Sequence, residues 1–407
     1  MLRERMFGNM GKEKGVRRYS TYEEGLAAQL RPIPEVMDGQ KHFEAGKMAL
    51  AIQALTRAAE ITESSRMPEL MVLSSEALAH VYQVSGDFAK ERAERAKSCE
   101  ILQDQLKSRD NDGETWRQEA FFNTLIQASL ADITMGGFDE TKTAEARDIA
   151  QRLSKVDDVE LCGIVDTLGT WVTESHTEGE DVSFVSDCVE SCDSAVGSNH
   201  ILTSQASLMY GIALQQTGKR EAAFDFLKKS VDATTSFSTL EVAGVRIETL
   251  QRLVDMAMQT KEMEAAKDYA STALKCAESV NNNGMIASCV HTLAKVSIAQ
   301  GDFVVGEGLL RTSMGRLQVP KGTCPLVWDL SVLQDATWTY GDLLDKLIFN
   351  NQSRKAEGDM ARAKLATIEK EHPLCAGGVR RLREAGLGQW HRRYLAPKVP
   401  VLLQEMP

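Results

Sequence analysis

Cys188 and Cys192 are the cysteines closest together in this chain, so they are the first candidates for metal chemistry. A separation of four residues places both thiols on one face of a helix, and His176 and His200 flank the pair. A structural zinc site needs about four converging ligands, normally from two close pairs, and the chain offers one such pair. We therefore interpret these cysteines as packing residues and expect neither a metal nor another cofactor.

Catalytic motifs with a known physical mechanism are absent from the sequence. It contains no phosphate-binding loop, no nucleophile elbow, no His-Glu-x-x-His helix and no glycine-rich dinucleotide fingerprint. The remaining cysteines are scattered, which is typical of a reducing compartment and of small apolar residues between helices. We expect a protein that is not an enzyme.

A phrase of fifteen residues recurs three times, at residues 216–230, 259–273 and 299–313. Its turn residues are Gly218, Lys261 and Gly301, and two earlier copies are centred on Gly46 and Gly86. Adjacent turns within each group are separated by roughly 40 residues, and internal repetition at this period predicts stacked helix hairpins. Continuing the period beyond Gly301 predicts another turn at Gly341-Asp342.

Each unit has an apolar-periodic helix, a tight turn and a second helix with a fixed pattern five, nine and twelve residues after the turn. The first unit has Ala51, Leu55 and Ala58 at these positions. Small side chains let helix axes approach closely. The pattern resembles the tetratricopeptide repeat, with a period longer than usual for that family. The resemblance covers residues 34–371 and weakens around residues 135–138 and 171–194.

The resemblance implies an all-α fold, a superhelical solenoid of about eight antiparallel helix hairpins with basic tails. The composition agrees, because nine prolines and 6% aromatic residues are few and strong helix formers dominate. We divide the chain into a basic N-terminal extension (1–33), the repeat domain (34–371) and a C-terminal capping helix with a basic and apolar tail (372–407).

Charge is distributed unevenly along the chain. Residues 1–19 and residues 378–407 each carry a net +4, so the total of −11 leaves −19 for the residues between them. An acidic body repels phosphate backbones, which makes nucleic acid an unfavourable partner along the solenoid but leaves it open at the tails. No run of eighteen apolar residues is present, so we expect no membrane span.

The first nineteen residues fit two interpretations. They are rich in arginine, and Arg17-Arg18-Tyr19-Ser20 resembles the cleavage site of mitochondrial presequences, which predicts import into the matrix. However, Glu4 and Glu13 are atypical of such a segment, and its glycines weaken a helix. The alternative is an uncleaved basic arm on a cytoplasmic protein.

The first helix of each hairpin should line a concave surface that faces a partner. Mixed amide, charged and apolar side chains suit a peptide or helix in such a groove. The residues expected to point inward are Glu76, His80 and Gln83; Ile212, Gln215 and Gln216; Gln251, Asp255 and Met258; His291, Lys295 and Ile298; and Trp338.

The C-terminal tail mixes arginines, aromatic residues and prolines, and it cannot fold alone. It either caps the last hairpin or docks on a neighbouring subunit. The residues that would make this contact are Arg380, Arg381, Arg383, Trp390, Arg392, Arg393 and Tyr394.

These features predict a non-catalytic scaffold that holds other protein subunits in a larger mitochondrial complex. The first alternative is an RNA-associated helical-repeat protein, such as a peripheral component of the mitochondrial ribosome. The second is a cytosolic or ciliary adaptor.

Overall fold

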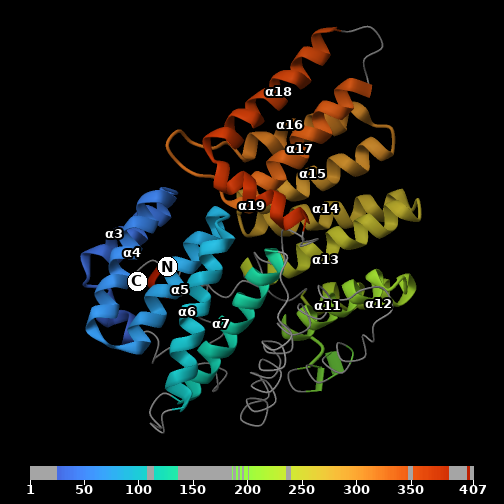
Figure 1. Cartoon of the computed structure of the whole chain (residues 1–407). Helices are drawn as coiled ribbons and strands as arrows, with labels where there is room; N and C mark the ends of the chain where they lie inside the picture. Colours follow the sequence, from blue (N-terminus) through green and yellow to red (C-terminus); the bar gives the residue numbers. More distant parts are fainter. Residues whose placement is uncertain are drawn as a thin grey trace.

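A computed structural model of the chain describes residues 25–107, 114–135, 201–234, 240–346, 352–384 and 401–403, with scattered positions between 186 and 199. The described elements are helical and contain no strand (Figure 1). The first hairpins are built from α3 (Pro34–Glu44), α4 (Met48–Ser65), α5 (Pro68–Ser85) and α6 (Phe88–Lys107), followed by α7 (Glu114–Thr134). The later ones are α11 (Ile201–Gln216) with α12 (Arg220–Ala233), α13 (Leu240–Gln259) with α14 (Met263–Ser279), α15 (Asn283–Ala299) with α16 (Phe303–Arg316), and α17 (Val327–Lys346) with α18 (Gln352–Glu371). The last elements are α19 (Pro373–Glu384) and the short 3₁₀ helix η2 (Val401–Leu403).

The five turns predicted from the repeat share one geometry. Gly46, Gly86, Gly218, Lys261 and Gly301 all have φ between 65° and 86°. In each turn the next N–H donates to the carbonyl five residues earlier, at 2.8–2.9 Å, as Lys47 does to His42. This is the Schellman motif, which ends a helix by satisfying its last carbonyl groups and favours glycine at the left-handed position. The repeat is therefore present at the level of individual hydrogen bonds.

The repeated small residues lie where the two helices of a hairpin cross. A Cβ at Gly39 would fall 2.7 Å from Leu55 Cγ, and one at Gly211 would fall 2.8 Å from Leu227 Cγ. Ala51 and Ala58 flank Leu55 and are fully buried, and the same holds for the equivalent residues of the hairpins α11–α12 and α13–α14. In these three hairpins the second helix thus packs a leucine or a small residue closely against the first.

The turn predicted at Gly341-Asp342 is wrong. Gly341 lies inside α17, and its neighbour across the hairpin is Gly358 of α18, where a Cβ would fall 3.5 Å from the Gly341 Cα. The glycine serves a close crossing of α17 and α18, and the chain turns only after Lys346.

The end of the array returns to its beginning. Helix α19 packs against α17, α18 and α5, and η2 packs against α3 and α5 (Figure 1). The segment between α16 and α17 reaches the first turn, where the Cys324 N–H donates to the Gly46 carbonyl at 3.1 Å. One apolar core consequently runs from residue 26, in the helical stretch 25–30, through the first hairpins to Leu402 and Leu403.

Candidate partner-binding site

The first helices of the later hairpins lie side by side. Helix α13 contacts α11 and α15, and α15 contacts α17, although each is separated in sequence by the second helix of a hairpin. Polar side chains on these first helices can therefore meet across hairpin boundaries. The structure brings together four of the residues predicted for the concave surface: Gln251, Asp255, His291 and Lys295.

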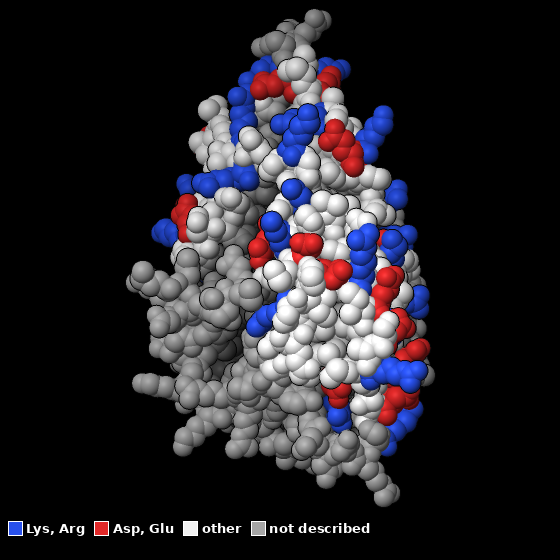
Figure 2. All heavy atoms as spheres, turned by 90° about the vertical axis from the view of Figure 1, so that its left-hand side faces the viewer, with Lys and Arg blue, Asp and Glu red and all other residues white. Residues whose placement is uncertain are grey.

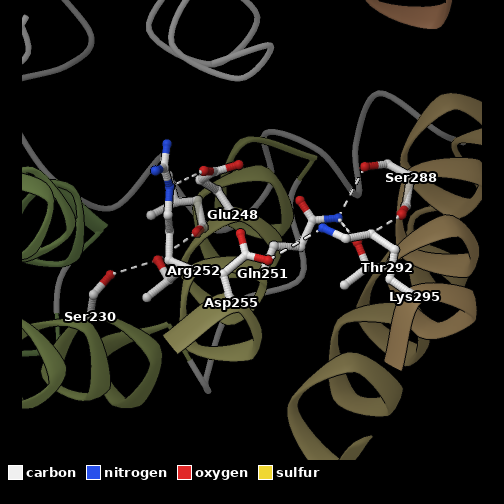
Figure 3. Close-up of polar contacts among 10 residues, drawn as sticks. Ser230, Glu248, Gln251, Arg252, Asp255, Ser288, Thr292 and Lys295 are labelled. Carbon is white, nitrogen blue, oxygen red and sulfur yellow. Dashed lines mark hydrogen bonds and ion pairs between the residues drawn. The ribbon is translucent and has the colours of Figure 1, made fainter. Parts of the chain in front are cut away.

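Gln251 joins α13 to α15. Its side-chain amide donates to Ser288 Oγ at 3.0 Å and to Thr292 Oγ1 at 3.1 Å (Figure 3). One residue along α13, Arg252 binds Glu248 at 2.8 Å. The bonds of Gln251 fix the register of the two inner helices.

Four charged residues of alternating sign cross the inner helices, and we call them the charged strip: Asp255, Lys295, Asp335 and Arg383. Lys295 Nζ lies 3.4 Å from Asp255 Oδ1 (Figure 3), and Arg383 Nη2 lies 2.6 Å from Asp335 Oδ1. Removal of Asp335 from water raises its pKa, and the charges of Arg383 and Lys295 oppose that rise. All four side chains are 42–47% exposed, so the strip is accessible to a partner.

His291 borders the charged strip on α15. Its Nε2 lies 3.1 Å from Thr339 Oγ1 of α17. Burial lowers the pKa of His291 to about 4, and the charge of Lys295 acts in the same direction. The ring is therefore neutral at pH 7 and serves as a polar spacer between the two helices.

The expected residues of the second hairpin are placed differently. His80 and Gln83 are buried, His80 against the ring of Phe43 and Gln83 in a hydrogen bond with Gln127 of α7. Glu76 forms an ion pair with Arg95 and accepts a hydrogen bond from Thr124 of α7. The expectation that these side chains face a partner is corrected for His80 and Gln83, because neighbouring helices cover them.

Several other expected residues pack within the array. Ile212 is buried in the core of the α11–α12 hairpin, and Ile298 lies against Gly306 of α16. Met258 packs on the core between α13 and α14. The exposed Trp338 lies under the guanidinium of Arg362 from α18, at 5.7 Å from the ring centroid. These four residues do not join the charged strip.

The remaining residues predicted to bind a partner lie on α11 and in the C-terminal part of the chain. Gln215 is partly exposed, and the side chain of Gln216 lies outside the described residues. On α19, Arg380 and Arg381 are exposed. Trp390, Arg392, Arg393 and Tyr394 lie outside the described residues, as do Cys188, Cys192, His176 and His200.

The second hairpin contains a buried ionic cluster that the repeat pattern does not predict. The positions that hold Ala51, Leu55 and Ala58 in the first hairpin hold Glu91, Arg95 and Ser98 here, and all three are buried. Arg95 contacts Glu76 and lies 3.9 Å from Glu91. The signal available in the sequence was an i,i+4 Glu–Arg pair at positions that are otherwise small or apolar.

Within the described part of the chain, no group of three or more His, Cys, Asp or Glu residues could hold a metal ion. None of its helices is both long and apolar enough to cross a membrane. On the face shown in Figure 2, Lys and Arg lie interspersed with Asp and Glu, without a large area of one sign among the coloured residues.

Comparison with known proteins gives structural neighbours but no family. No protein-family model matches the chain, and no curated protein matches it. Similar solved structures include the apo form of RapI, with 9% identity, 80% of this chain and 96% of RapI covered, and a TM-score of 0.41. BtubC (BKLC) from P. vanneervenii is 11% identical over 74% of this chain and 92% of its own, with a TM-score of 0.35. Yeast Tom70 is 12% identical over 93% and 94%, with a TM-score of 0.21.

The fold is tetratricopeptide-like. TM-scores of 0.21–0.41 carry no argument about function, so the assignment depends on this chain's own repeated turns, crossings and consecutive hairpins.

Proposed function

We propose that this protein is a non-catalytic scaffold that holds a segment of a partner protein along the charged strip. The observation that carries the proposal is the row of half-exposed, alternating charges contributed by α13, α15, α17 and α19. A rigid stack of hairpins fixes the positions of these charges, and fixed complementary charges give register and specificity to an interface.

The ion pairs within the strip are suited to exchange with a partner. Exposed pairs contribute only about 0.2–1 kcal/mol each, so a partner's charge can replace either member at small cost. The charged atoms of each pair lie close together, at 3.4 Å for Lys295 and Asp255 and at 2.6 Å for Arg383 and Asp335. A partner segment would therefore bind the strip with charges that compete for one member of each pair.

The basic tails and the acidic body support a proposal for the location of the protein and for the class of its partners. The arginine-rich residues 1–19 support a mitochondrial matrix location, and the acidic body supports protein subunits over RNA as the main partners. The alternatives are an RNA-associated role carried by the basic tails and a cytoplasmic adaptor.

The test is affinity purification of the tagged full chain from its native cells, followed by mass spectrometry with and without nuclease. We expect a defined set of proteins that nuclease does not release and that Lys295→Glu reduces by about tenfold, which corresponds to about 1.4 kcal/mol. Lys275→Glu is the matched control, because Lys275 is exposed on the outer helix α14. Release by nuclease would favour the RNA-associated role, and equal recovery with both variants would exclude the charged strip as the binding surface.

A further inference from the structure

Cys324 and Cys375 lie together where the end of the array meets its beginning. Cys324 belongs to the segment between α16 and α17, whose backbone binds the Gly46 carbonyl of the first hairpin. Cys375 lies in the first turn of α19, the helix that packs on Gly86 at the end of α5. The two cysteines are far apart in sequence, and they belong to two different elements that contact the first hairpins.

Both thiols share one hydrogen-bond acceptor. Cys324 Sγ and Cys375 Sγ each lie 3.4 Å from the carbonyl oxygen of Pro325. The single proton of the Cys375 thiol can be donated either to this carbonyl or to the Cys324 sulfur. Because both sulfur atoms contact the same oxygen atom, they lie near each other. A disulfide between them requires Cα atoms about 4.4–6.8 Å apart.

The two thiols differ in reactivity. The hydrogen bond from Cys375 lowers the pKa of Cys324, which is partly exposed. The same bond, together with burial, raises the pKa of Cys375. A thiolate is the nucleophile in cysteine oxidation, so Cys324 is the sulfur that an oxidant meets first and Cys375 is held as a thiol beside it.

We propose that Cys324 and Cys375 form a reversible disulfide that joins the α16–α17 segment to α19, two elements that contact the first hairpins, and so clamps the closed array. A hydroperoxide supplies the oxidising equivalents. The Cys324 thiolate attacks the peroxide and becomes a sulfenic acid, while the leaving alkoxide takes up a proton to give an alcohol. The Cys375 thiol then attacks the sulfenic sulfur, the S–S bond forms, and water leaves. In sum, two thiols and one hydroperoxide give one disulfide, one alcohol and one water.

The effect of the disulfide depends on the contacts made by the two segments that it joins. The segment around Cys324 binds the first hairpin, and α19 binds the second hairpin and contributes Arg383 to the charged strip. A covalent link between the two segments prevents either contact from opening independently of the other. Oxidation should therefore stabilise the closed array, which also forms while both cysteines are free thiols.

The first experiment is non-reducing peptide mapping of the full-length protein. The reduced chain is treated with one equivalent of hydrogen peroxide, alkylated and digested. We expect a Cys324–Cys375 linked peptide that dithiothreitol abolishes and that is absent from Cys324→Ser. Cys99→Ser is the matched control, since Cys99 is a partly exposed cysteine on α6, and this variant should still form the Cys324–Cys375 link. Intermolecular disulfides, pairing with another cysteine, or sulfinic acid at Cys324 would overturn the proposal.

The second experiment tests whether the disulfide, once formed, stabilises the closed array. The melting temperature of the oxidised protein should be higher than that of the reduced protein, and dithiothreitol should reverse the difference. Cys324→Ser should show no difference, and because Cys324 lies in a partly exposed segment this variant should fold. A mapped disulfide with no change in melting temperature would overturn the clamp.

Discussion

Gly378 of α19 packs directly on the backbone of Gly86 at the end of α5. A Cβ on Gly378 would fall 2.6 Å from the Gly86 Cα, so the contact exists because neither residue has a side chain. Gly86 serves its own hairpin as well, since its φ of 83° forms the Schellman turn. One residue thus ends a helix of the second hairpin and seats the last helix of the chain.

Gly378→Ala should separate α19 from α5. The added methyl group meets backbone atoms that cannot move aside, and overpacking of this kind costs about 1–3 kcal/mol. Gly377→Ala is the matched control, because a Cβ there has nothing within 4 Å and alanine favours a helix. Urea unfolding of both variants measures the difference, and equal stability would contradict the contact.

Arg95 balances two carboxylates in the interior of the second hairpin. Arg95→Leu should lower the free energy of unfolding by about 3–5 kcal/mol, because it removes the positive charge that lies between the buried Glu91 and Glu76. The double variant Glu91→Ala/Arg95→Leu restores the pattern of Ala51 and Leu55 in the first hairpin and should recover part of the loss.

The control for this series is Lys90→Met on the same helix. Lys90 pairs with Asp87 but its side chain is 61% exposed, so the change should stay within about 0.5 kcal/mol. A double variant less stable than Arg95→Leu alone would show that Glu91 stabilises the fold independently of Arg95.

The hairpin turns are predictable from sequence because their chemistry is local. A left-handed residue followed by the regular pattern of the second helix identifies each one, and even Lys261 could be assigned from its neighbours. Gly341 shows the limit of the same reasoning. A turn and a close helix crossing both require glycine, and only the position of α18 distinguishes them.

The residues of the candidate site are predictable from the sequence only where no other element of the chain covers the first helices of the hairpins. The position six residues before the turn gives Asp255 and Lys295, which lie in the charged strip, but the same position gives the buried His80 in the second hairpin. The difference arises because the ring of Phe43 from α3 packs on His80, and η2, at the opposite end of the sequence, also packs on α5. A repeat pattern contains no information about such a contact.

His80 should make the protein less stable in mild acid. Burial lowers its pKa to about 4 from 6.5, so below pH 6.5 the unfolded chain binds a proton that the folded chain does not. Stability is complete above pH 6.5 and falls as the pH drops toward 4, by up to about 1.4 kcal/mol per pH unit. His80→Gln should flatten this part of the profile of unfolding free energy against pH, and an unchanged slope would show that the pKa of His80 is the same in the folded and unfolded chains.

Leu402 and Leu403 should stabilise the first hairpins rather than the last one. Both are buried in the core that contains Val36 of α3 and Val72 of α5. Replacing both leucines with aspartate removes this packing and places charge in an apolar site, so we expect a loss of at least about 2–5 kcal/mol. Hydrogen exchange should report it as faster exchange in α3 and α5. Met360→Asp on α18 is the control, because Met360 is 66% exposed and lies outside this core. If exchange instead increased only in α17 and α18, the C-terminal segment would cap the end of the solenoid and would not close the array on its beginning.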